Sequence, residues 1–225
     1  MTTDSIFTKE ELKQIGARTS DLVDAAIDSG ELARAKKLNH RMNREFLEMH
    51  DLYLHWTAAL LSHIYRRFGD EALYQALDDS FRIPFRPVVD AFIASDARKK
   101  VEMFARGLRG HLQPLKIVED DEKVTIIMQP CGSGARLVQE KSYEPPMNLA
   151  KVKKGQMMTF GQKDFPVYCA HCSFHEILSL EWVGEPVLVM EPAVKSGEGS
   201  CRFHIYKDPK NIPARYYERF GKKKK

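Results

Sequence analysis

The sequence has little excess charge of either sign. Its 35 Lys and Arg residues against 31 Asp and Glu residues leave a formal net charge of +4 at pH 7, and the four lysines at 222–225 account for all of it. We interpret this run as a solvated basic tail, because nothing else in the composition favours a polyanionic partner. The sequence therefore predicts no nucleic-acid partner.

Long apolar runs are also absent. No stretch of about 18 uncharged apolar residues occurs, as a membrane-spanning helix would need, and the first residues lack the basic and apolar regions of a secretory signal. We expect a cytoplasmic protein with no membrane partner. Cysteine is scarce, with four residues at 131, 169, 172 and 201. They could form two disulfides, but in a cytoplasmic chain such spacing more often indicates metal or thiol chemistry.

The chain is otherwise typical of a globular protein, with 43% hydrophobic and 29% charged residues. The patterns described below predict an α+β protein, in which an N-terminal helical bundle packs on a C-terminal α/β layer with a mainly antiparallel sheet. We expect a helical portion at 1–114, a metal- and ligand-binding portion at 115–221 and the basic tail at 222–225.

Helix signals dominate the first half. Thr8 and Glu11 have the spacing of a capping box, and the pattern at 31–68 predicts a long helix closed by Gly69. The prolines within 83–87 predict a break, followed by one or two helices up to 112. The long helix carries apolar side chains around most of its circumference, which predicts a helix buried in the core or at a subunit interface of a homo-oligomer. These side chains are Phe46, Leu47, Met49, Leu52, Tyr53, Leu54, Trp56, Leu60, Leu61, Ile64 and Tyr65.

Strand signals begin after Pro114. Residues 116–119 and 124–128 flank an acidic turn and predict a β-hairpin. The region 142–162 has no clear periodicity and is expected to be an ordered loop over the sheet. The remaining predictions are a helix at 172–183 stopped by Gly184, a strand at 187–190, a turn at 195–199 and a strand at 201–206.

The densest group of reactive side chains is Cys169-x-x-Cys172-x-x-His175, preceded by Cys131. Thiolate and imidazole are the ligands that zinc prefers, and iron is the alternative. We predict a metal site at these four residues, in which one open coordination position would permit catalysis. Two alternatives remain: a metal-free thiol site, in which a helix N-terminus lowers the thiolate pKa of Cys172, and plain core cysteines.

A glycine-rich turn, Cys131-Gly-Ser-Gly134, follows the predicted hairpin. Its glycines would let the backbone approach a ligand, but the pattern lacks the Lys and the following residues of a phosphate loop. We predict substrate binding by Ser133 and Arg136, with the guanidinium holding a carboxylate. A surface salt bridge is an equally good interpretation of Arg136.

Four further residues are candidates for proton transfer. Glu176 and His171 lie within the Cys/His cluster, and Asp51 and His55 are spaced to share one face of the long helix. Each is a candidate general acid or base. The competing interpretation is a histidine or carboxylate satisfied by a neighbouring polar group.

The C-terminal pattern of a helix, Gly184, a strand, Ser196-Gly-Glu-Gly199 and Cys201-Arg-Phe203 resembles the ends of two related families. One is the L-2-amino-thiazoline-4-carboxylic acid hydrolase family, and the other is the vinyl-reductase-type small-molecule-binding domain. The resemblance covers roughly 115–206 and implies a pocket for a small organic molecule between helices and a curved antiparallel sheet. It implies hydrolytic ring opening in one family, and ligand sensing with a cysteine-bound zinc in the other. The Cys131 turn and the Cys169–His175 cluster depart from the hydrolase pattern.

Together these features predict a zinc- or iron-dependent hydrolase or lyase that acts on a small carboxylated heterocyclic or aromatic compound. The alternative is a non-catalytic, sensor-like protein that binds a small molecule and has a structural Cys/His metal site.

Overall fold

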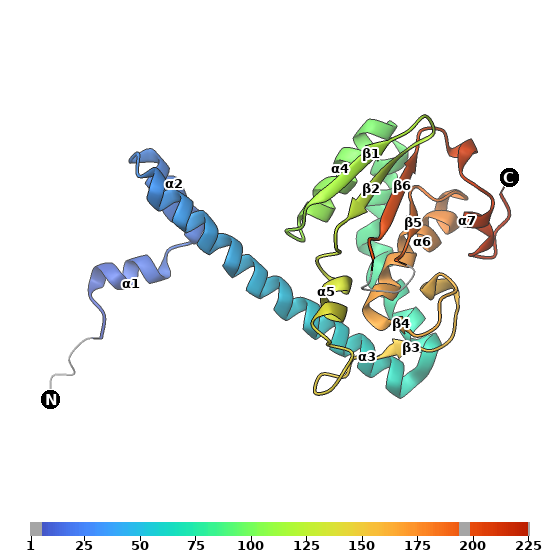
Figure 1. The fold of residues 1–225 in the computed structure, drawn as a ribbon, viewed down its shortest axis with the longest axis horizontal. Coiled ribbons are helices and arrows are strands. Elements are labelled where there is room, and N and C mark those ends of the chain that lie inside the picture. The colour runs from blue at the N-terminus through green and yellow to red at the C-terminus, as the bar shows by residue number, and fades with distance from the viewer. Residues whose placement is uncertain (1–5, 194–198, 225) are drawn as a thin grey trace. The chain divides into compact units, whose positions relative to one another are not determined.

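The computed structural model describes residues 6–193 and 199–224, and its chain divides into two compact units, Met1–Leu52 and Tyr53–Lys225. The architecture is α+β, with N-terminal helices followed by a region containing a four-stranded antiparallel sheet (Figure 1). Residue 114 lies within the second unit, where the chain passes from helix to sheet. Among the described residues, no helix has the length and apolar character needed to cross a membrane.

The elements are α1 (Lys9–Gly16), α2 (Thr19–Asp28), α3 (Leu32–Ile93), α4 (Ala97–Arg109), β1 (Leu115–Glu119), β2 (Lys123–Met128), α5 (Gly134–Gln139), β3 (Lys151–Val152), η1 (Met157–Thr159), β4 (Phe165–Pro166), η2 (Val167–Ser173), α6 (Phe174–Val183), β5 (Val189–Glu191), β6 (Arg202–Tyr206), η3 (Pro209–Asn211) and α7 (Arg215–Glu218).

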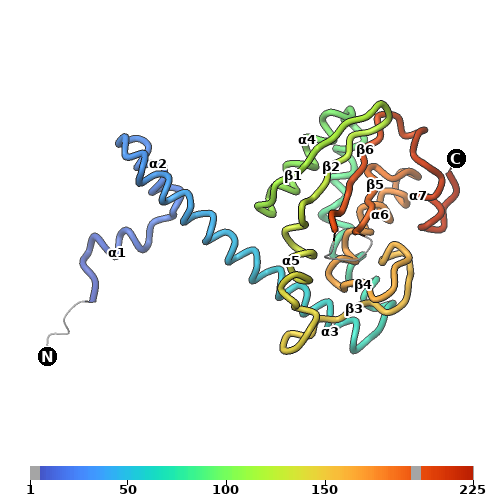
Figure 2. The backbone as a smooth tube through the Cα atoms, in the orientation of Figure 1, coloured from blue at the N-terminus to red at the C-terminus, as the bar shows by residue number. Residues whose placement is uncertain are grey.

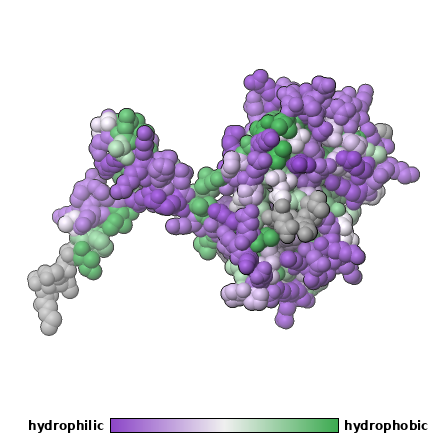
Figure 3. All heavy atoms as spheres, in the orientation of Figure 1, coloured by the Kyte–Doolittle hydropathy of each residue, from purple (hydrophilic) through white to green (hydrophobic). Residues whose placement is uncertain are grey.

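The first unit contains α1, α2 and the beginning of α3. The predicted capping box is confirmed: the backbone N–H of Glu11 donates to Thr8 Oγ1 at 3.2 Å, and the Thr8 N–H donates to the Glu11 carboxylate at 2.7 Å. The described part of this unit buries little, namely Thr19, Ala26 and Ala35. Its surface accordingly carries apolar side chains, coloured green in Figure 3.

Helix α3 consists of two helical segments that meet at Gly69, whose backbone (φ 84°, ψ −168°) is not helical. The predicted stop at Gly69 is therefore confirmed. The break predicted at 83–87 is wrong, because helix continues through Pro84 and Pro87 to Ile93. The physical reason is burial: Phe85, Val89 and Phe92 lie on one face of this segment and are buried. Their burial outweighs a cost of about 3 kcal/mol for a proline inside a helix.

The prediction that the segment 46–65 is buried in the core is wrong for six of its eleven apolar residues, whereas burial at a subunit interface stays a prediction. Phe46, Met49 and Trp56 are 45%, 51% and 58% exposed. Apolar side chains around the whole circumference show that a helix is apolar, but they do not show which part of the protein, or which partner, packs against it. The remaining exposed members of the set are Leu52, Tyr53 and Leu60.

The sheet has the strand order β1-β2-β6-β5, and all neighbours are antiparallel (Figure 2). Strands β1 and β2 form the predicted hairpin, with Leu115 opposite Met128. Helix α6 ends at Gly184 in the left-handed conformation, as predicted. The predicted C-terminal strands are present as β5 and β6, whereas the turn at 195–199 falls largely outside the described residues.

Three apolar clusters build the core of the second unit. One contains Leu108 of α4 with Ile126 and Phe203 of the sheet, and another joins the later part of α3 to α6. The region 142–162 is not a plain loop, because it contains β3 and η1, and β3 pairs with β4. The space between α3, α4, η2 and the sheet contains the principal cavity.

Candidate functional site

The principal cavity of the second unit has a volume of about 400 Å³ and a mainly apolar wall. The rings of Phe85, Phe92, Phe104, Phe165 and Phe203 contribute to this wall. Phe104 and Phe203 contact edge to face, with ring centroids 4.8 Å apart. A cavity of this size and character is typical of a site for a small organic ligand.

All four cysteines line this cavity. They are free thiols. Cys131 follows β2, Cys201 precedes β6, and Cys169 and Cys172 lie on η2. Because a 3₁₀-helix has three residues per turn, the spacing of three places the last two thiols on one face. Burial and the neighbouring thiols raise the pKa of both Cys169 and Cys172.

Three histidines also face the cavity: His111, His171 and His175. His171 Nδ1 donates to the carbonyl of Tyr168 at 2.5 Å, so that in the neutral ring Nε2 accepts from the Cys172 thiol 3.4 Å away. Burial lowers the pKa of His171 to about 4, which keeps the ring neutral at pH 7. For Cys172, the sequence predicted a lowered thiol pKa. This prediction is wrong, because burial raises the pKa of that thiol.

His175 is surrounded by aromatic rings. Its ring centroid is 4.7 Å from that of Phe85 and 6.2 Å from that of Phe104. Burial lowers the pKa of His175 to about 3, and its Nδ1 has no hydrogen-bond partner within the described part of the chain. Buried polar atoms without a partner are rare and costly. His175 Nδ1 is thus, within that described part, an unsatisfied buried atom of a residue that lines the cavity.

The turn Cys131-Gly-Ser-Gly134 is held by close backbone contacts. The N–H of Gly132 hydrogen-bonds to the side chain of Gln113, and Ser133 Oγ lies 2.7 Å from His111 Nδ1. A Cβ on Gly132 would meet the His111 carbonyl at 2.7 Å, so this position requires glycine. The turn places Cys131 and Ser133 in the cavity wall, and ligand binding by the turn stays a prediction.

Of the four predicted catalytic residues, one lines the cavity and three do not. His171 lines the cavity, but the buried carboxylate of Glu176 accepts hydrogen bonds from Arg219 Nη2 at 2.5 Å and from the Met190 N–H at 2.7 Å. His55 Nε2 lies 3.4 Å from Glu140 Oε2, and neither residue lines the cavity. In the first unit, Asp51 pairs with His50 at 3.0 Å.

The predicted carboxylate-binding residue Arg136 does not line the cavity, and its Nε lies 3.7 Å from the Glu140 carboxylate. Arg106, on α4, lines the cavity instead. Sequence reasoning missed Arg106, His111 and Cys201. Arg106 lies within α4 between the buried Ala105 and Leu108, and His111 follows the end of this helix.

The predicted metal ligands Cys131, Cys169, Cys172 and His175 all line the cavity. Within 6–193 and 199–224, however, no three His, Cys, Asp or Glu side chains are positioned to hold one metal ion. The zinc or iron ion therefore stays a prediction from the sequence.

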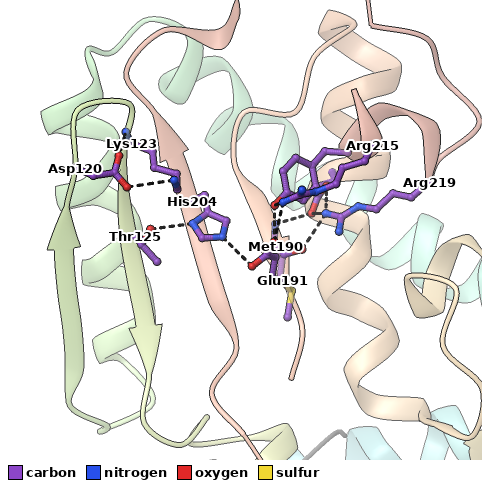
Figure 4. A network of polar contacts seen from close by, with 10 residues as sticks. Asp120, Lys123, Thr125, Met190, Glu191, His204, Arg215 and Arg219 are labelled. Atoms are coloured by element: carbon purple, nitrogen blue, oxygen red, sulfur yellow. Dashed lines mark hydrogen bonds and ion pairs between the residues drawn. The ribbon is translucent and has the colours of Figure 1, made fainter. Parts of the chain in front are cut away.

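A second polar network joins the sheet to the C-terminal helix (Figure 4). Thr125 Oγ1 and His204 Nδ1 lie 2.9 Å apart on paired strands, and His204 Nε2 lies 3.2 Å from Glu191. Arg219 reaches the Met190 carbonyl at 2.8 Å. These contacts fix the sheet edge behind the cavity wall to which Met190 contributes.

No family model matches the chain, and neither the curated proteins nor the solved structures include a significant match.

Proposed function

We propose that the protein binds a small carboxylated aromatic or heterocyclic molecule in the 400 Å³ cavity, as a sensor-like binding protein. The aromatic wall is the observation that carries this proposal. Flat rings bury well among Phe85, Phe104 and Phe203, with edge-to-face contacts available.

Polar groups in the same wall support recognition of a polar substituent. The Arg106 guanidinium is suited to a ligand carboxylate. The His175 imidazole contributes to the same wall. A few polar groups in an apolar wall are the usual basis of orientation and specificity.

Binding is better supported than catalysis. Glu176 is occupied by Arg219 and Met190, and the buried Cys172 thiol has a raised pKa, which makes it a weak nucleophile. The metal-dependent hydrolase therefore stays a prediction, as do the two families suggested by the C-terminal pattern.

The cellular setting is also a proposal. Four free thiols in one cavity favour a reducing compartment such as the cytoplasm. The first unit buries three of its described residues and exposes Phe46 and Met49. So small a core rarely stabilises a unit on its own. We propose that a second copy of the chain covers this surface in a homo-oligomer.

The binding proposal is tested by calorimetric titration with benzoate, 2-naphthoate and the neutral analogue benzamide. Arg106→Gln should weaken carboxylate binding about tenfold, corresponding to ~1.4 kcal/mol, and leave benzamide binding unchanged. Arg109→Gln is the matched control, because Arg109 is an exposed arginine on the same helix that does not line the cavity. Absence of binding by every compound to the folded protein would contradict the proposal.

A further inference from the structure

The fold brings four cysteines from three distant segments into one cavity wall. Strands β2 and β6 are antiparallel neighbours, and the Met128 N–H donates to the Cys201 carbonyl at 3.1 Å. Cys131 and Cys201 therefore lie at the same end of this strand pair. Cys169 and Cys172 join them from η2.

Hydrogen-bonding groups are already directed at the sulfur atoms. The Ser133 N–H donates to Cys131 Sγ at 3.5 Å, and the backbone of Ala193 hydrogen-bonds to the Cys201 thiol. Donors of this kind stabilise a thiolate and are among the groups that tune sulfur-ligated metal centres. Core cysteines kept only for their apolar volume do not need them.

An iron–sulfur cluster is held by cysteine thiolates that surround an inorganic core. The four cysteines that line this wall supply such a ligand set.

We propose that Cys131, Cys169, Cys172 and Cys201 bind an iron–sulfur cluster in the cavity. Cys201 replaces His175 in the ligand set predicted from the sequence. The cysteine spacing agrees with this assignment, since one Cys-x-x-Cys pair combined with two remote cysteines supplies the four thiolates that such clusters use. The cluster would share this cavity with the proposed organic ligand, so each proposal is given a test of its own.

The first test is the iron, acid-labile sulfide and zinc content of the full chain, purified without oxygen and after reconstitution with ferrous iron and sulfide. We expect equal amounts of iron and sulfide, about two to four of each per chain. About one zinc per chain without sulfide would overturn the proposal, and so would failure to retain iron and sulfide after reconstitution.

The ligand set is tested with two variants of opposite expectation. Cys201→Ser should lose most of the iron and sulfide, whereas His175→Gln should keep both. The reverse result would restore the set that contains His175. Circular dichroism checks folding, and if Cys201→Ser does not fold, the content of the wild type and of His175→Gln still decides the proposal. The benzoate titration of Arg106→Gln addresses the organic ligand separately.

Discussion

The Sγ atom of Cys169 occupies the space beside Gly134, only 2.5 Å from the position that a Cβ on Gly134 would take. Gly134 begins α5, and Cys169 lies on η2. The absence of a side chain at Gly134 therefore lets the glycine-rich turn and the cysteine segment meet in the cavity wall.

Gly134→Ala should displace the Cys169 thiol and destabilise the protein by about 1–3 kcal/mol, as overfilled sites usually do. Chemical denaturation measures the free energy of unfolding. Gly107→Ala is the control, because Gly107 lies in a helix with no atom within 4 Å of an added Cβ. That change should be neutral or stabilise by up to about 1 kcal/mol. Equal stability of the two variants would show that the contact is relieved at little cost.

Ser62→Ala should destabilise the second unit. The buried Ser62 hydroxyl accepts from the Ala150 N–H at 3.0 Å and donates to the Ala58 carbonyl at 2.7 Å. Its removal leaves a buried N–H unsatisfied, which costs about 1–3 kcal/mol. Ser80→Ala is the control, since the exposed Ser80 hydroxyl donates only to the Ala76 carbonyl; that change should stay within about 0.5 kcal/mol. Comparable losses in the two variants would refute the role given to Ser62.

The Glu176–Arg219 pair should make stability depend on pH. Burial raises the pKa of Glu176 from its ordinary value of 4.5 to about 7, against the opposing effect of Arg219. The folded state thus binds this proton more tightly than the unfolded state. The contribution to stability is complete below about pH 4.5 and is lost as the pH rises through about 7.

Arg219→Met removes the charge that compensates ionised Glu176. The loss should be about 3 kcal/mol or more near pH 8, and clearly smaller near pH 5, where Glu176 is protonated. Denaturation at the two pH values measures it. Arg215→Met is the control: its exposed pair with Glu191, at 3.5 Å, should contribute less than about 1 kcal/mol at either pH. An equal loss near pH 5 and pH 8 in Arg219→Met would exclude this linkage.

Phe46→Glu should shift the proposed homo-oligomer toward monomer, because it places a charge on an exposed apolar surface of the first unit. Light scattering after size-exclusion chromatography measures the mass over a range of concentrations. Asn43→Glu adds the same charge at an exposed polar position and should leave the mass unchanged. A monomeric wild type at high concentration would rule out self-association.

Local signals predicted much of the fold. The capping box at Thr8, the stops at Gly69 and Gly184, and the acidic turn of the hairpin each depend on a few adjacent residues. The prolines of α3 led to the wrong prediction of a helix break. The free-energy cost of a proline inside a helix is outweighed by the burial of Phe85 and its neighbours. That burial depends on elements far away in the sequence.

The candidate site, too, was only partly predictable from local sequence. The cavity wall contains Cys131, Cys169, Cys172 and His175, as the clustering of reactive residues suggested. Cys201 could not be added from its own surroundings, because its position follows from the pairing of β2 with β6. The pairing of Glu176 with Arg219 could not be predicted from local sequence, because Arg219 is 43 residues further along the chain.

The pairing of β6 beside β2 also determines when the thiols can meet during biosynthesis. Cys201 precedes the strand that holds it in place, and that strand ends at Tyr206. A nascent chain that still lacks this strand has no means of holding Cys201 beside the other three thiols. Any centre that needs all four must therefore be inserted after the ribosome has released β6.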